Sequence, residues 1–349
     1  MKSLLTLGVI FTLSGCTDLG FYWQAASGHI ELLNRKQDID ELIKSPNTSS
    51  ELKRKLKLAE SVRNFAGDKM GLPQNTSYTG YVELDRPFVT MVVTAAEPLE
   101  LKSVEWCYFL IGCQEYRGYF DEEDAKDLAL ELKERNFDVS IFGVSAYSTL
   151  DWLNKPWLPN YFSDPVLSTF LLKHDVVLIA TIIHEMAHQV VYVDGDTAFN
   201  ESFATFVEQE GLRQFLIEMG NSNIIEGNSE KLFQWYLSYH KDRQLFRKIV
   251  KKTFKKMEIL FSGNSTDTEK FNEKKKLLDE LRKNYKIQKR EFKVLSYDKW
   301  FERELNNSHL MGVQRYNIQV DKFRLLFEEN GKQWSKFFDA VRKVKKSKS

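Results

Sequence analysis

Apolar residues recur at roughly helical spacing through the first part of the chain. Ser49 or Ser50 can cap a segment whose apolar positions run from Leu52 to Phe65, before Gly71. This pattern predicts that residues 17–72 are mainly helical.

Between Tyr78 and about Leu110 the pattern changes to β-branched and aromatic runs. The clearest predicted strand covers residues 88–94, and residues 139–144 predict another. A helix is predicted between them over 121–135, because acidic residues gather in its first turn, where the helix dipole favours them. Residues 143–147 fit either a core strand or an edge strand that pairs with extended substrate.

The rest of the chain is predominantly helical in pattern. Residues 150–165, rich in Trp, Pro and Asn, predict an ordered loop, and helical spacing follows at about 165–192, 197–218, 229–261, 268–305 and 316–344. A small sheet set before a helical half predicts the α+β class. We expect five parts: an N-terminal segment 1–15, a helical segment 16–75, a β-containing part 76–160, a helical part 161–220 and a C-terminal helical region 221–349.

Composition describes an ordinary globular protein, with 42% hydrophobic and 28% charged residues. Lys and Arg (50) nearly balance Asp and Glu (49), so bulk charge predicts no nucleic-acid partner. The basic residues from Arg342 to Lys348 are an exception. They fit a solvated terminus or a contact with anionic lipid.

The N-terminus has the form of an export signal. Lys2 precedes an apolar run from Leu4 to Leu13, which is too short to span a bilayer. The sequence Leu-Ser-Gly-Cys at 13–16 resembles the lipobox of a bacterial lipoprotein, which implies cleavage before Cys16 and a membrane anchor through lipid on that cysteine. We therefore expect a lipid-anchored protein of the cell envelope, on the periplasmic side, and Thr17 is compatible with the outer membrane. A buried N-terminal helix is the alternative.

Cysteine usage agrees with export. Lipidation of Cys16 leaves Cys107 and Cys113 as the remaining cysteines. In an oxidising compartment these two can close a short disulfide loop.

A metal-binding motif lies in the second half of the chain. His184-Glu185-Met186-Ala187-His188 places two imidazoles four residues apart, on one face of one helix, where they can share a cation. In zinc sites of this kind the intervening glutamate, here Glu185, acts as base toward the attacking water. The structural alternative is a pair of polar residues on a buried helix.

Catalytic zinc usually takes three protein ligands. Val191 and Asp194 stand where a metzincin would have Gly and His, so that class is excluded. A second helix is predicted from Asp196 or Thr197, so Glu201 can face back across the turn as third ligand. The acidic alternatives for this ligand are Glu208, Asp194 and Asp196.

A further group has to orient the ligating histidines. The position four after Glu201 holds Thr205, where some gluzincins have an acidic residue. Asp164, His174 and Asp175 are the candidates for that role.

Several strings give the chain a resemblance to the family of bacterial predicted zinc aminopeptidases, which are of gluzincin type and include lipoproteins. These strings are YWQA at 22–25, YRGYF at 116–120, GVSAYST at 143–149 and GDTAFNESFA at 195–204, together with the zinc motif. The resemblance implies a zincin-like fold, one zinc ion and a peptide substrate. It also makes Tyr316 and His309 candidates to stabilise the oxyanion.

Three functions follow as hypotheses. The first is a zinc aminopeptidase in which Glu185 assists attack of zinc-activated water on the peptide bond. The second is an envelope zinc endopeptidase, and the third is a non-catalytic lipoprotein that serves as a binding scaffold. Aminopeptidase specificity rests on the resemblance, because spacing selects none of Glu97, Glu115 and Glu208 to bind a substrate ammonium group.

Overall fold

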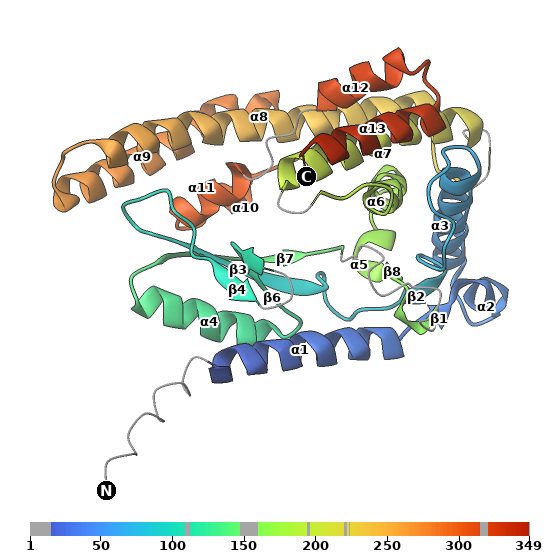
Figure 1. The fold of residues 1–349 in the computed structure, drawn as a ribbon, viewed down its shortest axis with the longest axis horizontal. Helices are drawn as coiled ribbons and strands as arrows, with labels where there is room; N and C mark the ends of the chain where they lie inside the picture. Colours follow the sequence, from blue (N-terminus) through green and yellow to red (C-terminus); the bar gives the residue numbers. More distant parts are fainter. Residues whose placement is uncertain are drawn as a thin grey trace, which may run out of the picture.

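The computed structural model describes residues 15–348, except 109–111, 147–159, 194–195, 220–221, 223 and 315–319. The predicted signal segment and most of the predicted loop 150–165 therefore lie outside the described residues. The chain forms an α+β structure in which a long layer of helices lies over a second layer that contains the sheets (Figure 1).

The N-terminal part is helical, as predicted. Its helices are α1 (Gly15–Asn34), α2 (Ile39–Lys44) and α3 (Ser50–Asp68). Ser49 is the N-cap of α3, and its hydroxyl accepts a hydrogen bond from the backbone N–H of Leu52 at 3.2 Å. The predicted cap is therefore confirmed at Ser49.

One antiparallel sheet has the strand order β6-β3-β7. Its strands are β3 (Thr90–Ala96), β6 (Arg117–Tyr119) and β7 (Asp138–Val144). Helix α4 (Glu122–Glu134) packs on it through buried Leu132, Val93 and Val139, and Asp121 caps that helix. The predicted strand 88–94 is thus shifted by two residues, whereas the helix predicted over 121–135 agrees to within one residue at each end.

A two-stranded sheet carries the cysteine pair. Strands β4 (Trp106–Tyr108) and β5 (Gly112–Gln114) run antiparallel, with Cys107 directly opposite Cys113. A disulfide joins these two residues.

The helix predicted over 165–192 is wrong in its first part. Strand β8 (Val166–Leu167) pairs in parallel with β2 (Gly80–Val82), which also pairs with β1 (Gln37–Asp38). A short 3-10 helix, η1 (Asn160–Phe162), comes before β8, and helix α5 (Ser168–Leu171) follows β8. Val and Leu fit a buried strand as well as a helix, and long-range pairing with β2 decides between them.

The helical layer contains the remaining elements. They are α6 (Asp175–His188), α7 (Thr197–Met219), α8 (Ser229–Ser262), α9 (Asp267–Gln288), η2 (Lys289–Glu291), α10 (Asp298–Phe301), α11 (Asn307–Gln314), α12 (Val320–Glu329) and α13 (Trp334–Lys348). The predictions of single helices over 268–305 and 316–344 are therefore wrong. The second breaks at Gly331, which has φ of 67°, a backbone conformation that glycine adopts readily.

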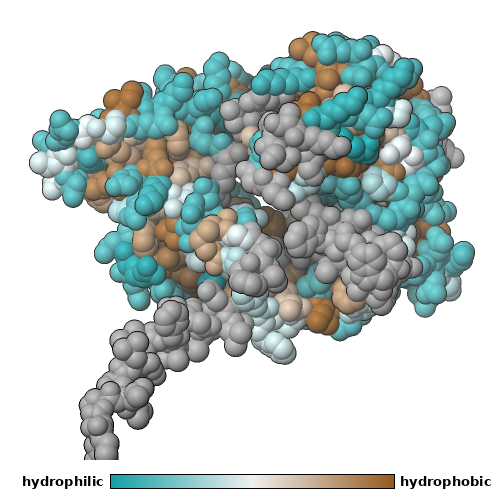
Figure 2. Space-filling view, in the orientation of Figure 1, coloured by the Kyte–Doolittle hydropathy of each residue, from teal (hydrophilic) through white to brown (hydrophobic). Residues whose placement is uncertain are grey.

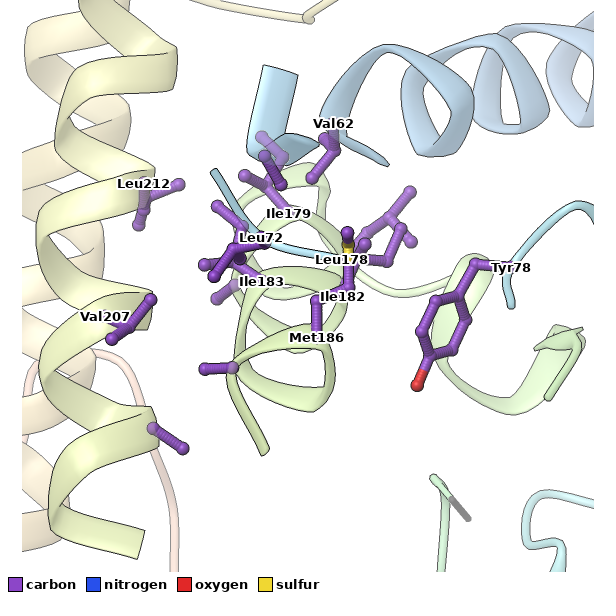
Figure 3. Packing of buried hydrophobic residues seen from close by; sticks show 14 of the residues in the cluster. Val62, Leu72, Tyr78, Leu178, Ile179, Ile182, Ile183, Met186, Val207 and Leu212 are labelled. Carbon is purple, nitrogen blue, oxygen red and sulfur yellow. The ribbon is translucent and has the colours of Figure 1, made fainter. Parts of the chain in front are cut away.

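Helix α6 lies at the centre of the main core. Leu178, Ile179, Ile182 and Ile183 have no exposed surface, and residues such as Val62 of α3 and Val207 of α7 surround them (Figure 3). A helix that is apolar on nearly every side has to be buried. Polar groups on α6 are therefore held inside the protein rather than at its surface.

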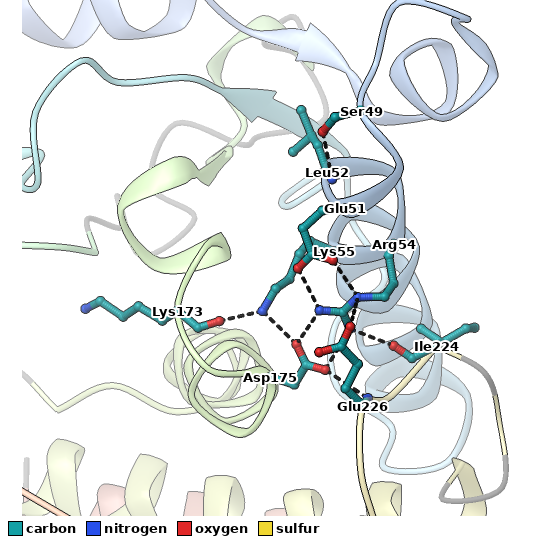
Figure 4. A network of polar contacts seen from close by, with 9 residues as sticks. All are labelled: Ser49, Glu51, Leu52, Arg54, Lys55, Lys173, Asp175, Ile224 and Glu226. Carbon is teal, nitrogen blue, oxygen red and sulfur yellow. Dashed lines mark hydrogen bonds and ion pairs between the residues drawn. The ribbon is translucent and has the colours of Figure 1, made fainter.

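Charged residues hold the first turn of α6 against α3. The Asp175 carboxylate accepts hydrogen bonds from Arg54 at 2.7 Å and from Lys55 at 2.6 Å, and from the backbone N–H of Glu226 at 3.2 Å (Figure 4). The Asp175 and Lys55 side chains are only 5% and 7% exposed. The buried carboxylate and the buried ammonium group thus neutralise each other.

A second core joins α8, α9, α10 and α11. Asp242 of α8 is buried there, and its carboxylate accepts hydrogen bonds from the backbone N–H groups of Lys293, Val294 and Leu295. This one side chain fixes the segment that returns from the end of α9 toward α8.

Candidate metal centre

Helices α6 and α7 bring His184, His188 and Glu201 together. The Nε2 atoms of the two histidines lie 3.2 Å apart. Glu201 places its oxygens 3.5 Å from His184 Nε2 and 3.6 Å from His188 Nε2. One potential ligand atom from each residue therefore points to a common position, and all three atoms lie within 4.8 Å of one another.

These separations fit a zinc ion. Zinc bonds to His nitrogen and carboxylate oxygen are about 2.0–2.2 Å long, so tetrahedral ligand atoms lie roughly 3.3–3.6 Å apart. The three measured separations lie at or close to this range. Two imidazoles and one carboxylate are also a donor set that zinc prefers. The residues present therefore fit the metal that the sequence predicts.

The start of α7 is fixed so that Glu201 faces α6. Asp196 accepts a hydrogen bond from the backbone N–H of Phe199 at 2.9 Å, which caps the helix. Asn200 is buried and forms two hydrogen bonds of 2.8 Å with the backbone of Val193. Of the alternative ligands, Asp196 is thus occupied as a cap, and Asp194 lies outside the described residues.

Glu208 contacts the other nitrogen of His184. Its Oε2 lies 2.9 Å from His184 Nδ1, and its Oε1 accepts a hydrogen bond of 2.6 Å from the Tyr236 hydroxyl. His240 Nε2 is 3.5 Å from the same Oε1. Glu208 is therefore placed to orient His184 rather than to serve as the third member of the group.

Two of the three residues predicted to orient the histidines, Asp175 and His174, have other contacts. Asp175 is bound by α3 as described, and His174 caps α6 and stacks on Trp235 with ring centroids 4.3 Å apart. Asp164 is buried, and its backbone C=O accepts a hydrogen bond from Tyr78. The prediction missed Glu208 as the orienting group, because its contact depends on how α6 and α7 are aligned.

The carboxylates and imidazoles of this site have strongly shifted pKa values. Burial raises the pKa of Glu185 to about 7, and burial together with the His184 charge lowers the pKa of His188 to about 4. Burial acts against ionisation of Glu208, but the neighbouring His184 and His240 hold the pKa of this carboxyl well below its ordinary value. Glu201 and Glu208 are therefore ionised beside the histidines.

Two residues, Tyr316 and His309, are predicted to stabilise the oxyanion. Tyr316 lies outside the described residues. His309 is on α11, where its Nδ1 lies 2.7 Å from Asn306 Oδ1, and burial first of all lowers its pKa to about 4. Among the described strands, β7 pairs with β3 alone, so it is an edge strand of its sheet.

The space-filling view shows a hollow between the helical layer and the layer that contains the sheets (Figure 2). Hydrophilic residues cover most of the outer part of the helical layer in that view. Among the described residues, no helix combines the length and the apolar character needed to cross a membrane.

Comparisons with known proteins give one match. The model of a family described as "Putative aminopeptidase" matches residues 20–349. No curated protein and no solved structure matches the chain. Since the family match extends over nearly the whole chain, this protein belongs to that family of aminopeptidase-like proteins.

Proposed function

We propose that this protein is a zinc-dependent peptidase in which His184, His188 and Glu201 hold a single zinc ion. The convergence of these three side chains, beside the buried carboxylate of Glu185, is the observation that carries the proposal. Membership of the aminopeptidase family makes peptides the expected substrates. A zincin-like fold of gluzincin type remains part of the same proposal.

When bound, zinc would polarise the scissile carbonyl and make water a stronger nucleophile at neutral pH. Glu185 takes the proton from the attacking water and delivers it to the leaving amine. Because Glu185 follows His184 directly on α6, its carboxylate is held beside the ligands by the same buried helix. Its role requires no large movement of the chain.

Glu208 acts as a positioning residue. Its contact with His184 Nδ1 stabilises the tautomer in which that nitrogen carries the proton. The Nε2 lone pair of His184 is then free to bind the metal. Tyr236 donates to the second oxygen of Glu208 and so fixes the orientation of the carboxylate.

The edge strand β7 offers a place for the substrate backbone. Phe142 and Gly143 are exposed, and an extended peptide can add to such an edge through main-chain hydrogen bonds. We propose that the substrate lies along β7.

The proposal includes export and lipidation at Cys16, which places the enzyme at the envelope surface of a bacterium. Cys16 lies in the first turn of α1, next to the end of the predicted signal segment. Replacement by serine should release the protein from the membrane fraction and abolish incorporation of a labelled fatty acid. Unchanged labelling of Cys16→Ser would contradict the anchor without affecting the zinc proposal.

Metal analysis and peptide hydrolysis test the function together. The purified protein should contain one zinc per chain and should cleave peptides with a free N-terminus. Cleavage of N-terminally blocked peptides alone would identify an endopeptidase. A protein that lacks zinc and cleaves neither kind of peptide would be a binding scaffold, and the proposal would be wrong.

A further inference from the structure

A strongly basic groove lies on the same side of α7 as the metal-binding group. It is a cavity of about 670 Å³ between α7, α8, α11 and α12, and Figure 1 shows α12 above α8 in the helical layer. Its cationic residues on α8 are Arg243, Arg247, Lys248, Lys251, Lys252 and Lys255. We refer to this cavity as the basic groove.

Among the described residues that line the basic groove, cationic side chains outnumber acidic ones. Arg324 of α12 adds a further cation on the opposite wall, and Asp321 is the one acidic residue among the described residues that line it. Lys251 and Lys255 are exposed, and no ion pair joins either of them to a carboxylate in the described part of the chain. Like charges this close repel one another, so an anionic ligand would stabilise the arrangement.

The cations have the spacing of a continuous binding surface. Positions 243, 247, 251 and 255 follow one another every four residues and therefore lie along one face of α8. At about 1.5 Å per residue this face is about 18 Å long. An extended peptide of about five or six residues has the same length, at about 3.3 Å per residue.

The basic groove begins beside the metal-binding group. His240 lines the groove and also lies 3.5 Å from Glu208, which contacts the ligand His184. Thr205 also lines the groove, and it lies between Glu201 and Glu208 in the sequence of α7. One end of the groove therefore lies next to Glu208, which contacts the Nδ1 side of His184.

We propose that the basic groove binds an acidic segment of the peptide substrate through its carboxylates. This inference rests on the proposed peptidase function. The carboxylates could come from Asp and Glu side chains or from the C-terminus of the peptide. A peptide fits better than single-stranded nucleic acid, because no Phe, Tyr or Trp ring for base stacking is present among the described residues that line the groove.

Binding can be measured without turnover, by calorimetry on the full chain carrying Glu185→Gln. The probes are a short peptide that alternates Glu with Ala, its Gln counterpart, and both peptides with an amidated C-terminus. We expect the Glu peptide to bind more tightly and its affinity to fall as salt rises. In the double variant K251Q/K255Q its affinity should fall by about tenfold, roughly the effect of losing two exposed ion pairs.

The matched control is K231Q/K241Q, which removes two exposed cations of the same helix outside the groove. It should bind the Glu peptide like the parent chain. Weaker binding of both amidated peptides than of their free-acid forms would identify the C-terminal carboxylate as the bound group, and a preference for Glu that survives amidation would identify the side chains. Either result supports the groove as a carboxylate site.

Binding of the Glu peptide no tighter than that of the amidated Gln peptide, or equal losses in the two double variants, would overturn the proposal. Tighter, groove-dependent binding of an oligonucleotide or of phosphatidylglycerol vesicles than of the Glu peptide would also overturn it. Hydrolysis by the chain with Glu185 intact is measured separately. A chain that binds the Glu peptide but cleaves no peptide contradicts the proposed function. A chain that cleaves peptides but binds the Glu peptide no tighter than the amidated Gln peptide contradicts the groove alone.

Discussion

The two ends of α6 carry buried charged groups that are arranged in opposite ways. At the first turn, Asp175 receives donors from Arg54, Lys55 and the main chain, so its oxygens are saturated within the protein. At the last turn, His184 and His188 meet Glu201 with their acceptor atoms directed at one another. The first arrangement is complete without a ligand, whereas the second would be stabilised by a cation at the common position.

This difference helps to separate structural from functional charge clusters. Asp175 and His188 are both buried on α6, so burial alone would not distinguish the two groups. They differ in the atoms that surround the carboxylate. Asp175 receives hydrogen bonds from Arg54, Lys55 and the main chain, whereas Glu201 faces the Nε2 atoms of two histidines.

The largest effect is expected from Glu185→Gln. Amide nitrogen and oxygen cannot take a proton from water, so peptidase activity should fall by about 10²- to 10⁴-fold. Zinc content and melting temperature should stay as in the parent, because Glu185 is not one of the three ligands. Loss of zinc along with activity would instead make Glu185 a ligand.

Asp175→Asn should lower the free energy of unfolding by about 3–5 kcal/mol, because it leaves the ammonium group of Lys55 buried without its counterion. The measurement is urea unfolding of the metal-free chain. The control is Glu226→Gln. The Glu226 carboxylate is 72% exposed and lies 3.3 Å from Arg54, so this change should lower the free energy of unfolding by less than about 1 kcal/mol. Equal losses in the two variants would mean that the pair with Lys55 contributes little.

Glu208→Gln should weaken zinc binding by about 10- to 100-fold, since it removes the charged partner of His184 Nδ1. Competition with a chelator measures this affinity. Glu210→Gln is the control, because Glu210 lies on the same helix but pairs with Arg213. If both variants bind zinc like the parent, Glu208 has no positioning role.

The smallest expected effect is on the stability of the protein at low pH. Arg54 and Lys55 act against burial and hold the pKa of Asp175 below its ordinary value of 3.8. A carboxyl whose pKa is lowered by folding stabilises the protein above its unfolded pKa, and this contribution is lost as pH falls through the folded value. The stability difference between the parent and Asp175→Asn should therefore narrow below about pH 3.8. A difference that widens in acid would contradict this ion pair.

The features that could be predicted from sequence are mostly local. His184 and His188 are four residues apart, so their common face follows from helix geometry alone. The caps at Ser49 and Asp121 depend on neighbouring backbone N–H groups in the same way. The prediction of Glu201 required one further inference, namely that a turn between two helices brings this residue back toward the histidines.

The features that were missed depend on long-range alignment. Glu208 meets His184 across 24 residues of sequence, and β8 is a strand because β2 lies beside it. The cations of α8 are visible as a stripe in the sequence, but the position of Arg324 across from them is a property of the folded chain. Bulk charge balance concealed this groove, because acidic residues elsewhere cancel it in the sum.

The contact between Asp242 and the backbone of Lys293 closes a loop whose ends are 51 residues apart in sequence. Everything from the middle of α8 through α9 is thereby tied into one cooperative unit with its own core. A cooperative unit unfolds as a whole. The amide hydrogens of residues 293–295 should therefore exchange with solvent deuterium at the rate at which α8 and α9 unfold together. The wall of the basic groove that α8 forms would then unfold at the rate of α8 and α9, and not at the rate of α6.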